Sequence, residues 1–138
     1  MSLLAQWSTG MGEKSRFIIV GGIGTIIAWA TYSIIHQILP FHNRAIIAWI
    51  LGYLIAVFQQ HSLHRRFTFF STQESFFPEL FRAYGAYSLG LIFSTGIHAH
   101  LTMNMLIHHQ ISWIFSTGVS VISNFVTLKL FVFNPSKD

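Results

Sequence analysis

Cysteine is absent from this 138-residue chain, and charged residues are scarce. The absence of cysteine excludes disulfide bonds and metal sites that depend on thiolate ligands. Only 9% of the residues are charged and 52% are hydrophobic, whereas about one quarter of an average soluble domain is charged. The length is that of one domain, and the composition is that of a membrane protein.

Three long stretches contain no Asp, Glu, Lys or Arg: residues 17–43, 45–64 and 83–128. A helix needs about 20 residues to cross a hydrocarbon core of about 30 Å, so the first two stretches predict one span each and the third predicts two. Unpaired backbone polar groups are not tolerated in lipid, so these spans are expected to be helical. The sequence therefore predicts an all-α membrane protein with four transmembrane helices.

The charges and turn residues that flank these stretches place the expected helices. They cover about residues 16–39, 45–64, 81–107 and 111–130. Pro40 suits the end of the first helix, and a polar linker separates the second helix from the third. The first helix is longer than the apolar core of a secretion signal and is followed by further spans, so we expect it to be retained.

Basic residues are distributed unevenly between the two ends of the expected helices. Seven lie on the side of both termini: Lys14, Arg16, Arg65, Arg66, Arg82, Lys129 and Lys137. Arg44 alone lies on the other side. Cytoplasmic loops of membrane proteins are enriched in Lys and Arg, so both termini are expected in the cytoplasm. Because these cations flank apolar spans, we expect membrane lipids, and not nucleic acid, as their partners.

The two halves of the chain resemble each other. "HSLHRRFTF" and "FVTLKLFVF" both end in a cation followed by two aromatic residues at alternate positions. At an offset of 66, Glu13, Arg16 and Gly24 match Glu79, Arg82 and Gly90, and at an offset of 64, "IAWI" from Ile47 matches "ISWI" from Ile111. A unit that crosses twice enters the membrane in the same direction each time. We therefore predict a single domain, residues 1–138, made of two parallel repeats of a helical hairpin at about 13–69 and 79–133.

Three motifs lie at the ends of the expected helices: "RFIIVGGIGT" at 16–25, "HRRFTF" at 64–69 and "NFVTLKLFVF" at 124–133. With the four spans and the chain length, these motifs resemble the GtrA-like family of small four-helix membrane proteins over nearly the whole chain. His64 stands where the family commonly has Asn, and Lys129 and Phe131 stand where it commonly has Arg and Trp. These replacements keep polarity or charge.

The resemblance implies a role in cell-envelope polysaccharide modification. A multi-pass protein of the bacterial inner membrane is expected, which moves a polyprenyl-phosphate-linked sugar from the cytoplasmic to the outer leaflet. The alternative is a non-transporting anchor or accessory subunit of a membrane glycosyltransferase. A small multidrug exporter also has four short helices, but it depends on a carboxylate within its first helix, and residues 17–43 contain none.

A group of cations at the expected cytoplasmic end is the first candidate site. It consists of Arg16, Arg65, Arg66, Arg82 and Lys129. Guanidinium groups form bidentate hydrogen bonds with phosphate, so these residues are candidates for binding the phosphate of a polyprenyl lipid. The same residues also suit a role in setting the topology of the chain and in contacting ordinary lipid phosphates.

Polar side chains extend this end into the second and fourth helices. They are Gln60, His61, His64 and Asn124. An unpaired amide is costly inside a membrane. These side chains are therefore expected either to hydrogen-bond between helices or to bind the sugar headgroup beside the phosphate.

His98 lies near the middle of the expected third helix. Three interpretations apply to it: a midmembrane polar path for the headgroup, a proton relay, and hydrogen bonding between helices. His98 and His100 are about 200° apart around a helix, so they do not form a metal site together. No paired carboxylates, nucleophile set or phosphate-binding glycine loop is visible, so we expect neither an enzyme nor a bound metal or cofactor.

Small residues recur at close spacing, as at Gly21, Gly24 and Ala28. Such spacing lets helices approach closely. These small residues serve either helix packing within the chain or a homo-oligomer interface. The sequence does not distinguish the two.

Overall fold

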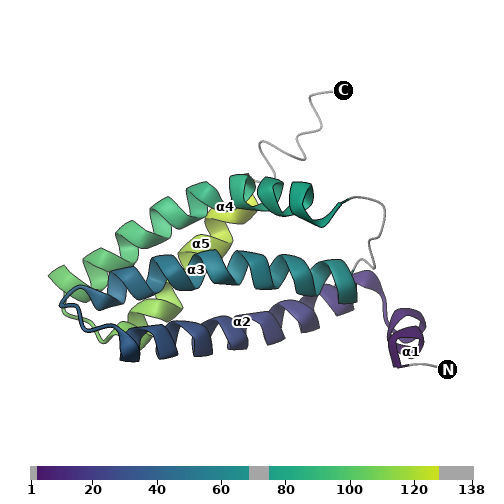
Figure 1. The fold of residues 1–138 in the computed structure, drawn as a ribbon, viewed down its shortest axis with the longest axis horizontal. Coiled ribbons are helices and arrows are strands. Elements are labelled where there is room, and N and C mark those ends of the chain that lie inside the picture. The colour runs from purple at the N-terminus through teal and green to yellow at the C-terminus, as the bar shows by residue number, and fades with distance from the viewer. Residues whose placement is uncertain (1–2, 69–74, 128–138) are drawn as a thin grey trace.

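The computed structural model describes residues 3–68 and 75–127, and the elements in these ranges are all helical (Figure 1). They are α1 (Leu3–Gly10), α2 (Glu13–Ile38), α3 (Arg44–Leu63), α4 (Phe76–Ala99) and α5 (His109–Thr127), with π-helical turns η1 (His64–Thr68) and η2 (His100–Asn104) after α3 and α4. The all-α prediction holds for the described ranges.

Helices α2 to α5 correspond to the four expected helices, but some of their bounds differ, and one further helix is present. The short helix α1 lies where no helix was expected. The π-helical turn η1 continues α3 to Thr68, into the segment expected to be a linker. Helix α4 begins at Phe76, which places Pro78 in its first turn. Proline is tolerated there because the first backbone N–H groups of a helix have no partner within it.

Two of the helices are long and apolar enough to cross a membrane: α2, and the combined helix of α3 and η1 over Arg44–Thr68. In their apolar windows only 17% and 22% of the residues are buried inside the protein. Most of their apolar side chains therefore point outward, unlike those of a core helix in a soluble protein. By length and hydropathy, two of the four predicted spans are therefore confirmed as candidate membrane helices among the described residues.

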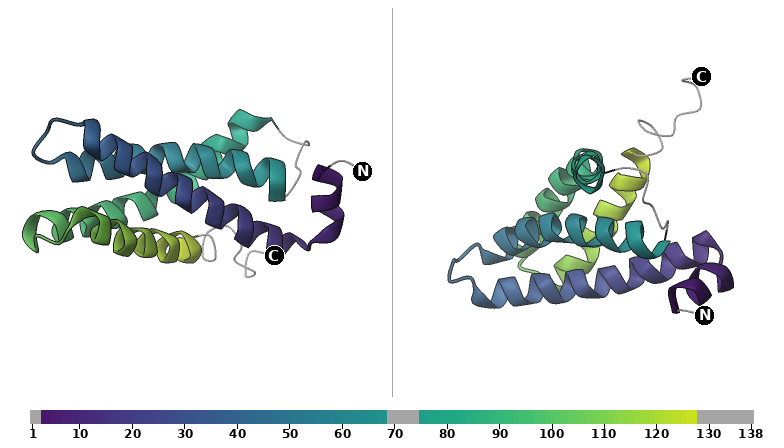
Figure 2. Two further views of the ribbon diagram at one scale, coloured as in Figure 1. Left: turned by 90° about the horizontal axis from the view of Figure 1, so that it is seen from below. Right: turned by 45° about the vertical axis from the view of Figure 1, so that its right-hand side comes forward.

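The chain forms two antiparallel hairpins, α2 with α3 and α4 with α5. Helix α3 packs against both α2 and α4, while α5 crosses behind α3 and packs against α4 (Figures 1 and 2). We call the end of the bundle that holds the starts of α2 and α4 the terminal end. The opposite end, with the connections at residues 39–43 and 105–108, is called the turn end.

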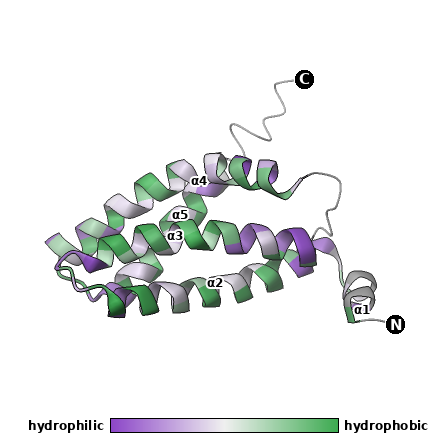
Figure 3. Ribbon diagram, viewed as in Figure 1, coloured by the Kyte–Doolittle hydropathy of each residue, from purple (hydrophilic) through white to green (hydrophobic). Residues whose placement is uncertain are grey.

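The interior is small and contains many polar groups. Its apolar cluster consists of Tyr32, Ala48, Trp49 and Trp113. Ser94, Ser112 and Ser116 are also fully buried, whereas large apolar residues such as Ile18 and Phe93 are exposed. Apolar residues follow the outer length of the bundle, and hydrophilic residues gather where α3 reaches the terminal end (Figure 3). This is the arrangement of a bundle with lipid around it.

Candidate functional site

Arg16, near the start of α2, is buried at the terminal end. Its Nε and Nη2 donate to the carbonyl oxygen of Thr68 at 3.1 and 3.0 Å, and its Nη1 donates to that of Met11 at 2.6 Å. Nearby, the indole N–H of Trp7 donates to the carbonyl oxygen of Phe67 at 2.6 Å. These bonds satisfy carbonyl groups where η1 ends and hold the segment before α2 against it. Arg16 thus has a structural role, and its predicted contact with lipid phosphate stays a prediction.

Arg65 pairs with Glu79, which lies in the first turn of α4. The Arg65 Nη1 is 2.7 Å from the Glu79 Oε2, and the guanidinium carbon is 5.6 Å from the centre of the Phe76 ring. His61 Nε2 lies 3.5 Å from the same carboxylate oxygen, beyond good hydrogen-bond geometry. The Arg65 and Glu79 side chains are mostly buried, so this pair joins the end of α3 to the start of α4.

The remaining predicted cations differ from these two. Arg66 and Arg82 are exposed, and the Arg66 guanidinium carbon lies 5.6 Å from the centre of the Phe67 ring. Lys129 lies outside the described residues. The structure therefore separates the predicted set by exposure: Arg16 and Arg65 lie mostly inside the protein, and Arg66 and Arg82 lie at its surface.

Two glycines make room for the two predicted amides inside the bundle. A Cβ atom added at Gly24 on α2 would overlap the Gln60 amide from α3, and one added at Gly90 on α4 would overlap the Asn124 amide from α5. Asn124 Nδ2 donates to the Tyr53 hydroxyl at 3.2 Å. Gln60 Oε1 is buried and accepts no hydrogen bond from the described residues. Both amides thus lie between helices, and one of them keeps an unused acceptor.

His64 closes the terminal end against α2. Its ring stacks on Phe17 with the centroids 4.5 Å apart and the planes 16° apart. Its Nδ1 lies 2.9 Å from the Thr68 hydroxyl. His64 therefore packs α2 against η1, beside the carbonyl group that Arg16 holds.

His98 is fully buried, and all four long helices meet at it. Its Nε2 is 3.0 Å from the Tyr32 hydroxyl on α2, and its Nδ1 is 3.1 Å from the Ser116 hydroxyl on α5. The Trp49 indole of α3 stacks on the imidazole with the centroids 5.0 Å apart. His98 therefore hydrogen-bonds between helices, which is one of its three predicted roles.

The Tyr32 hydroxyl extends this set of hydrogen bonds toward the turn end, because it also lies 3.2 Å from His109 Nδ1. A hydroxyl group or a neutral imidazole donates one hydrogen bond and accepts another. Three hydrogen bonds therefore link His109, Tyr32, His98 and Ser116. They can all run from His109 toward Ser116, or all run the opposite way. Sequence reasoning missed Tyr32 and His109. The sequence repeat could have identified Tyr32, because Tyr32 and His98 occupy matching positions at the offset of 66.

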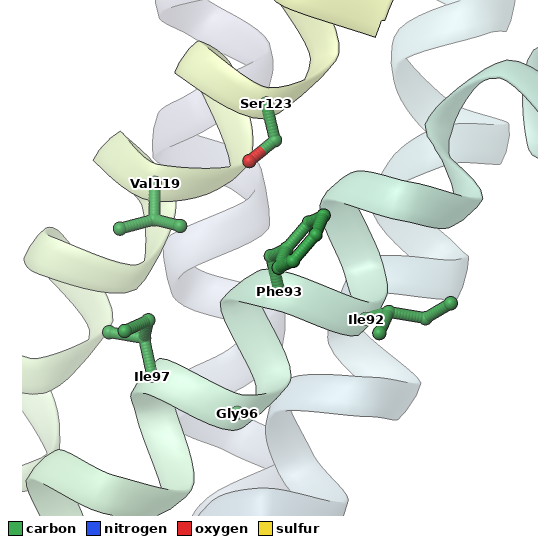
Figure 4. Close-up of a pocket in the computed structure, with 6 residues that line it drawn as sticks. All are labelled: Ile92, Phe93, Gly96, Ile97, Val119 and Ser123. Atoms are coloured by element: carbon green, nitrogen blue, oxygen red, sulfur yellow. The ribbon is translucent and has the colours of Figure 1, made fainter.

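A shallow apolar groove lies between α4 and α5, away from all these residues (Figure 4). Its volume is about 490 Å³, and its lining consists of Ile92, Phe93, Gly96, Ile97, Val119 and Ser123. Ser123 alone contributes a polar side chain. The groove offers no set of groups that would recognise a phosphate or a sugar.

Comparison with known proteins gives one match. A family model described as "GtrA/DPMS, transmembrane domain" matches residues 16–133. No curated protein and no solved structure matches the chain significantly. The matched residues extend from the buried Arg16 through all four long helices.

Proposed function

The chain belongs to the GtrA/DPMS transmembrane-domain family, and we propose that it moves a polyprenyl-phosphate-linked sugar from the inner to the outer leaflet of the bacterial inner membrane. In this proposal the terminal end binds the lipid phosphate, the sugar follows the polar interior, and the prenyl chain stays in the lipid. The protein acts as a carrier and catalyses no covalent reaction. The family supports the substrate class, and the positions of the cations support the binding end.

The observation that carries the proposal is the set of arginines at the terminal end. Arg16 and Arg65 are bonded to carbonyl groups and to Glu79, and Arg66 and Arg82 on η1 and α4 are exposed. Hydrophilic residues gather where α3 reaches this end, next to the apolar length of the bundle (Figure 3). Guanidinium groups at the edge of an apolar belt are suited to bidentate contact with a lipid phosphate.

In the proposed topology all four long helices cross the membrane, with both termini in the cytoplasm and the two hairpins as parallel repeats. Corresponding positions support the repeats. Gly24 with Gln60 and Gly90 with Asn124 make the same kind of glycine–amide contact. The pairs Tyr32 with His98 and Trp49 with Trp113, related by offsets of 66 and 64, are all buried in the centre.

The sugar is proposed to meet the amides inside the terminal end. Buried acceptors without a partner are costly unless a ligand or water satisfies them. Gln59 Oε1 and Gln60 Oε1 are two such acceptors among the described residues. Sugar hydroxyl groups donate hydrogen bonds of the kind that these oxygens lack.

The test is translocation by the purified full-length chain in proteoliposomes that carry a fluorescent, short-chain polyprenyl phosphate sugar. An impermeant reductant added outside destroys only the label in the outer leaflet, so translocation appears as loss of the label from both leaflets. We expect the wild-type chain to give this loss and Arg66→Gln combined with Arg82→Gln to slow it about tenfold, as expected when charge-assisted contacts to phosphate are removed. Lys14→Gln, at an exposed cation of the same end, is the matched control.

The accessory-subunit alternative gives the opposite result in this assay. The wild-type chain would leave the inner-leaflet label intact and would co-purify with a glycosyltransferase from its native membrane. That outcome would reject the carrier function.

A further inference from the structure

The turn end also collects cationic groups, but of a different kind. Its basic side chains are His36, His42, Arg44, His100, His108 and His109. Residues 14–73 and 80–137 contain neither Asp nor Glu, so no carboxylate balances these groups. A count of Lys and Arg alone does not reveal this group, because five of its six members are histidines.

His36 and His109 form the centre of this group. Their rings stack with the centroids 3.6 Å apart and the planes 6° apart. His36, on α2, has only 9% of its surface exposed, and neither of its ring nitrogens makes a hydrogen bond with a described residue. His109, at the start of α5, uses Nδ1 toward Tyr32, which leaves its Nε2 available. Each of these two imidazoles thus keeps at least one ring nitrogen that can hydrogen-bond to a ligand.

The surroundings of this pair favour an anion. Arg44 and His108 are close enough to interact electrostatically with His36, and both side chains are exposed. Helices α3 and α5 begin at this end, so the positive ends of two helix dipoles lie here. Asn43, which precedes α3, gives that helix no side-chain cap.

The geometry of the rings argues against a cation. A metal ion needs lone pairs that converge on one point, whereas these two rings are nearly parallel. No group of three or more metal-binding side chains exists in the described part of the chain. An imidazole N–H can instead donate a hydrogen bond to an oxygen of a phosphate group.

We propose that His36 and His109, with Arg44 beside them, form a second anion site at the turn end that binds a phosphate group. The assignment of this site to the lipid phosphate arriving at the outer leaflet rests on the proposed function, whereas the affinity for phosphate does not. When His109 donates through Nε2 to the phosphate, its neutral Nδ1 accepts from Tyr32. The hydrogen-bond chain then runs from Ser116 through His98 and Tyr32 to His109, so the occupied site sets the direction of the bonds in the core.

The test titrates the full-length chain in phosphate-free maltoside micelles and follows the imidazole nitrogens by NMR. The probes are inorganic phosphate, geranyl phosphate and, as the uncharged control, geraniol. We expect both phosphates to shift the His36 and His109 signals and geraniol to leave them unchanged. In His36→Gln the apparent affinity read at His109 should fall at least about tenfold, which corresponds to about 1.4 kcal/mol.

His100→Gln is the matched control, because His100 is an exposed histidine at the same end that bonds to Asn104 instead. It should keep the wild-type affinity. Equal losses in His100→Gln and His36→Gln, or no shift with either phosphate, would overturn the site. Binding of inorganic phosphate without geranyl phosphate would overturn the lipid assignment.

The two proposals fail in different ways in this experiment. Arg66→Gln with Arg82→Gln should leave the His36 and His109 shifts unchanged, because those arginines lie at the other end. Phosphate shifts in a protein that moves no lipid would reject the carrier function and keep the turn-end site. Rapid lipid movement with no phosphate shift at these histidines would reject the site alone.

Discussion

The two ends of the bundle both collect positive groups, and they do so with different chemistry. The terminal end uses arginines, which are permanently charged, and also holds the carboxylates of Glu13 and Glu79. The turn end uses mainly imidazoles, without any carboxylate nearby. Imidazoles carry charge only when protonated and hold it weakly near neutral pH.

The ends also differ in how their cationic side chains are held. Arg16 bonds to main-chain oxygens, so the terminal end depends on it for local structure. His36 is held by stacking and bonds to none of the described residues. Loss of the Arg16 side chain should therefore affect stability more than loss of the His36 side chain.

The largest effect is expected from Arg16→Gln. It removes charge-assisted bonds to the buried carbonyl groups of Thr68 and Met11, which should lower the free energy of unfolding by about 3 kcal/mol. Chemical unfolding in micelles, followed by tryptophan fluorescence, measures it. Lys14→Gln, at an exposed cation in the first turn of the same helix, should change stability little. Equal losses in the two variants would show that the buried bonds of Arg16 do not stabilise the protein.

The next effect concerns the glycine–amide contacts of the terminal half. Gly24→Ala and Gly90→Ala place a methyl group against Gln60 and Asn124, and overpacking of this kind costs about 1–3 kcal/mol. The matched controls are Gly22→Ala and Gly96→Ala, where an added Cβ meets no atom within 4 Å. Alanine is the better helix former, so the controls should be neutral or slightly stabilising. Thermal unfolding measures the stability of all four variants. A lower unfolding temperature for the controls than for the test variants would contradict the proposed overpacking.

A smaller effect is expected from Tyr32→Phe in the turn half. It removes the hydroxyl that lies between His98 and His109 and leaves both imidazoles without that partner. The expected loss is about 1–2 kcal/mol. Tyr84→Phe, which removes an exposed hydroxyl bonded to the Leu54 carbonyl, should cost less. The same unfolding assay compares the two, and a larger loss in Tyr84→Phe would rule out a central role for Tyr32.

The smallest effect is expected at the ion pair of the terminal end. Arg65→Gln and Glu79→Gln break a mostly buried pair that water partly screens, so each should cost about 1 kcal/mol or less. Because the two side chains contact each other, the double variant should cost less than the sum of the two. Additive losses in a double-mutant cycle would show that the two side chains act independently.

Much of the fold was predictable because the chain has to satisfy its backbone in lipid. Charge-free stretches between basic residues predicted the positions of α2, α3, α4 and α5. The short helix α1 and the extension of α3 to Thr68 were not predictable. The latter depends on Arg16 and Trp7, which satisfy the carbonyl groups at the end of η1 from a segment about fifty to sixty positions earlier in the chain.

The sequence predicted which residues are candidates for the site, but it did not predict how they are arranged in space. The sequence identified the arginines, the amides and His98 as polar groups where polar groups are costly. It gave no means to tell that Arg16 is buried and Arg82 exposed, although the two match in the repeat. It also missed His36 and His109, since rules for topology count only residues that are always charged.

By itself the sequence determined that this is a helical membrane protein of two similar halves, because hydrophobic length and charge position act locally along the chain. The tertiary structure alone decided which polar groups meet. His98 contacts Tyr32, Trp49 and Ser116 from three other helices, and His36 stacks on His109 across the bundle. Such contacts depend on how the helices rotate and cross, and those angles are set by the packing of all four helices together.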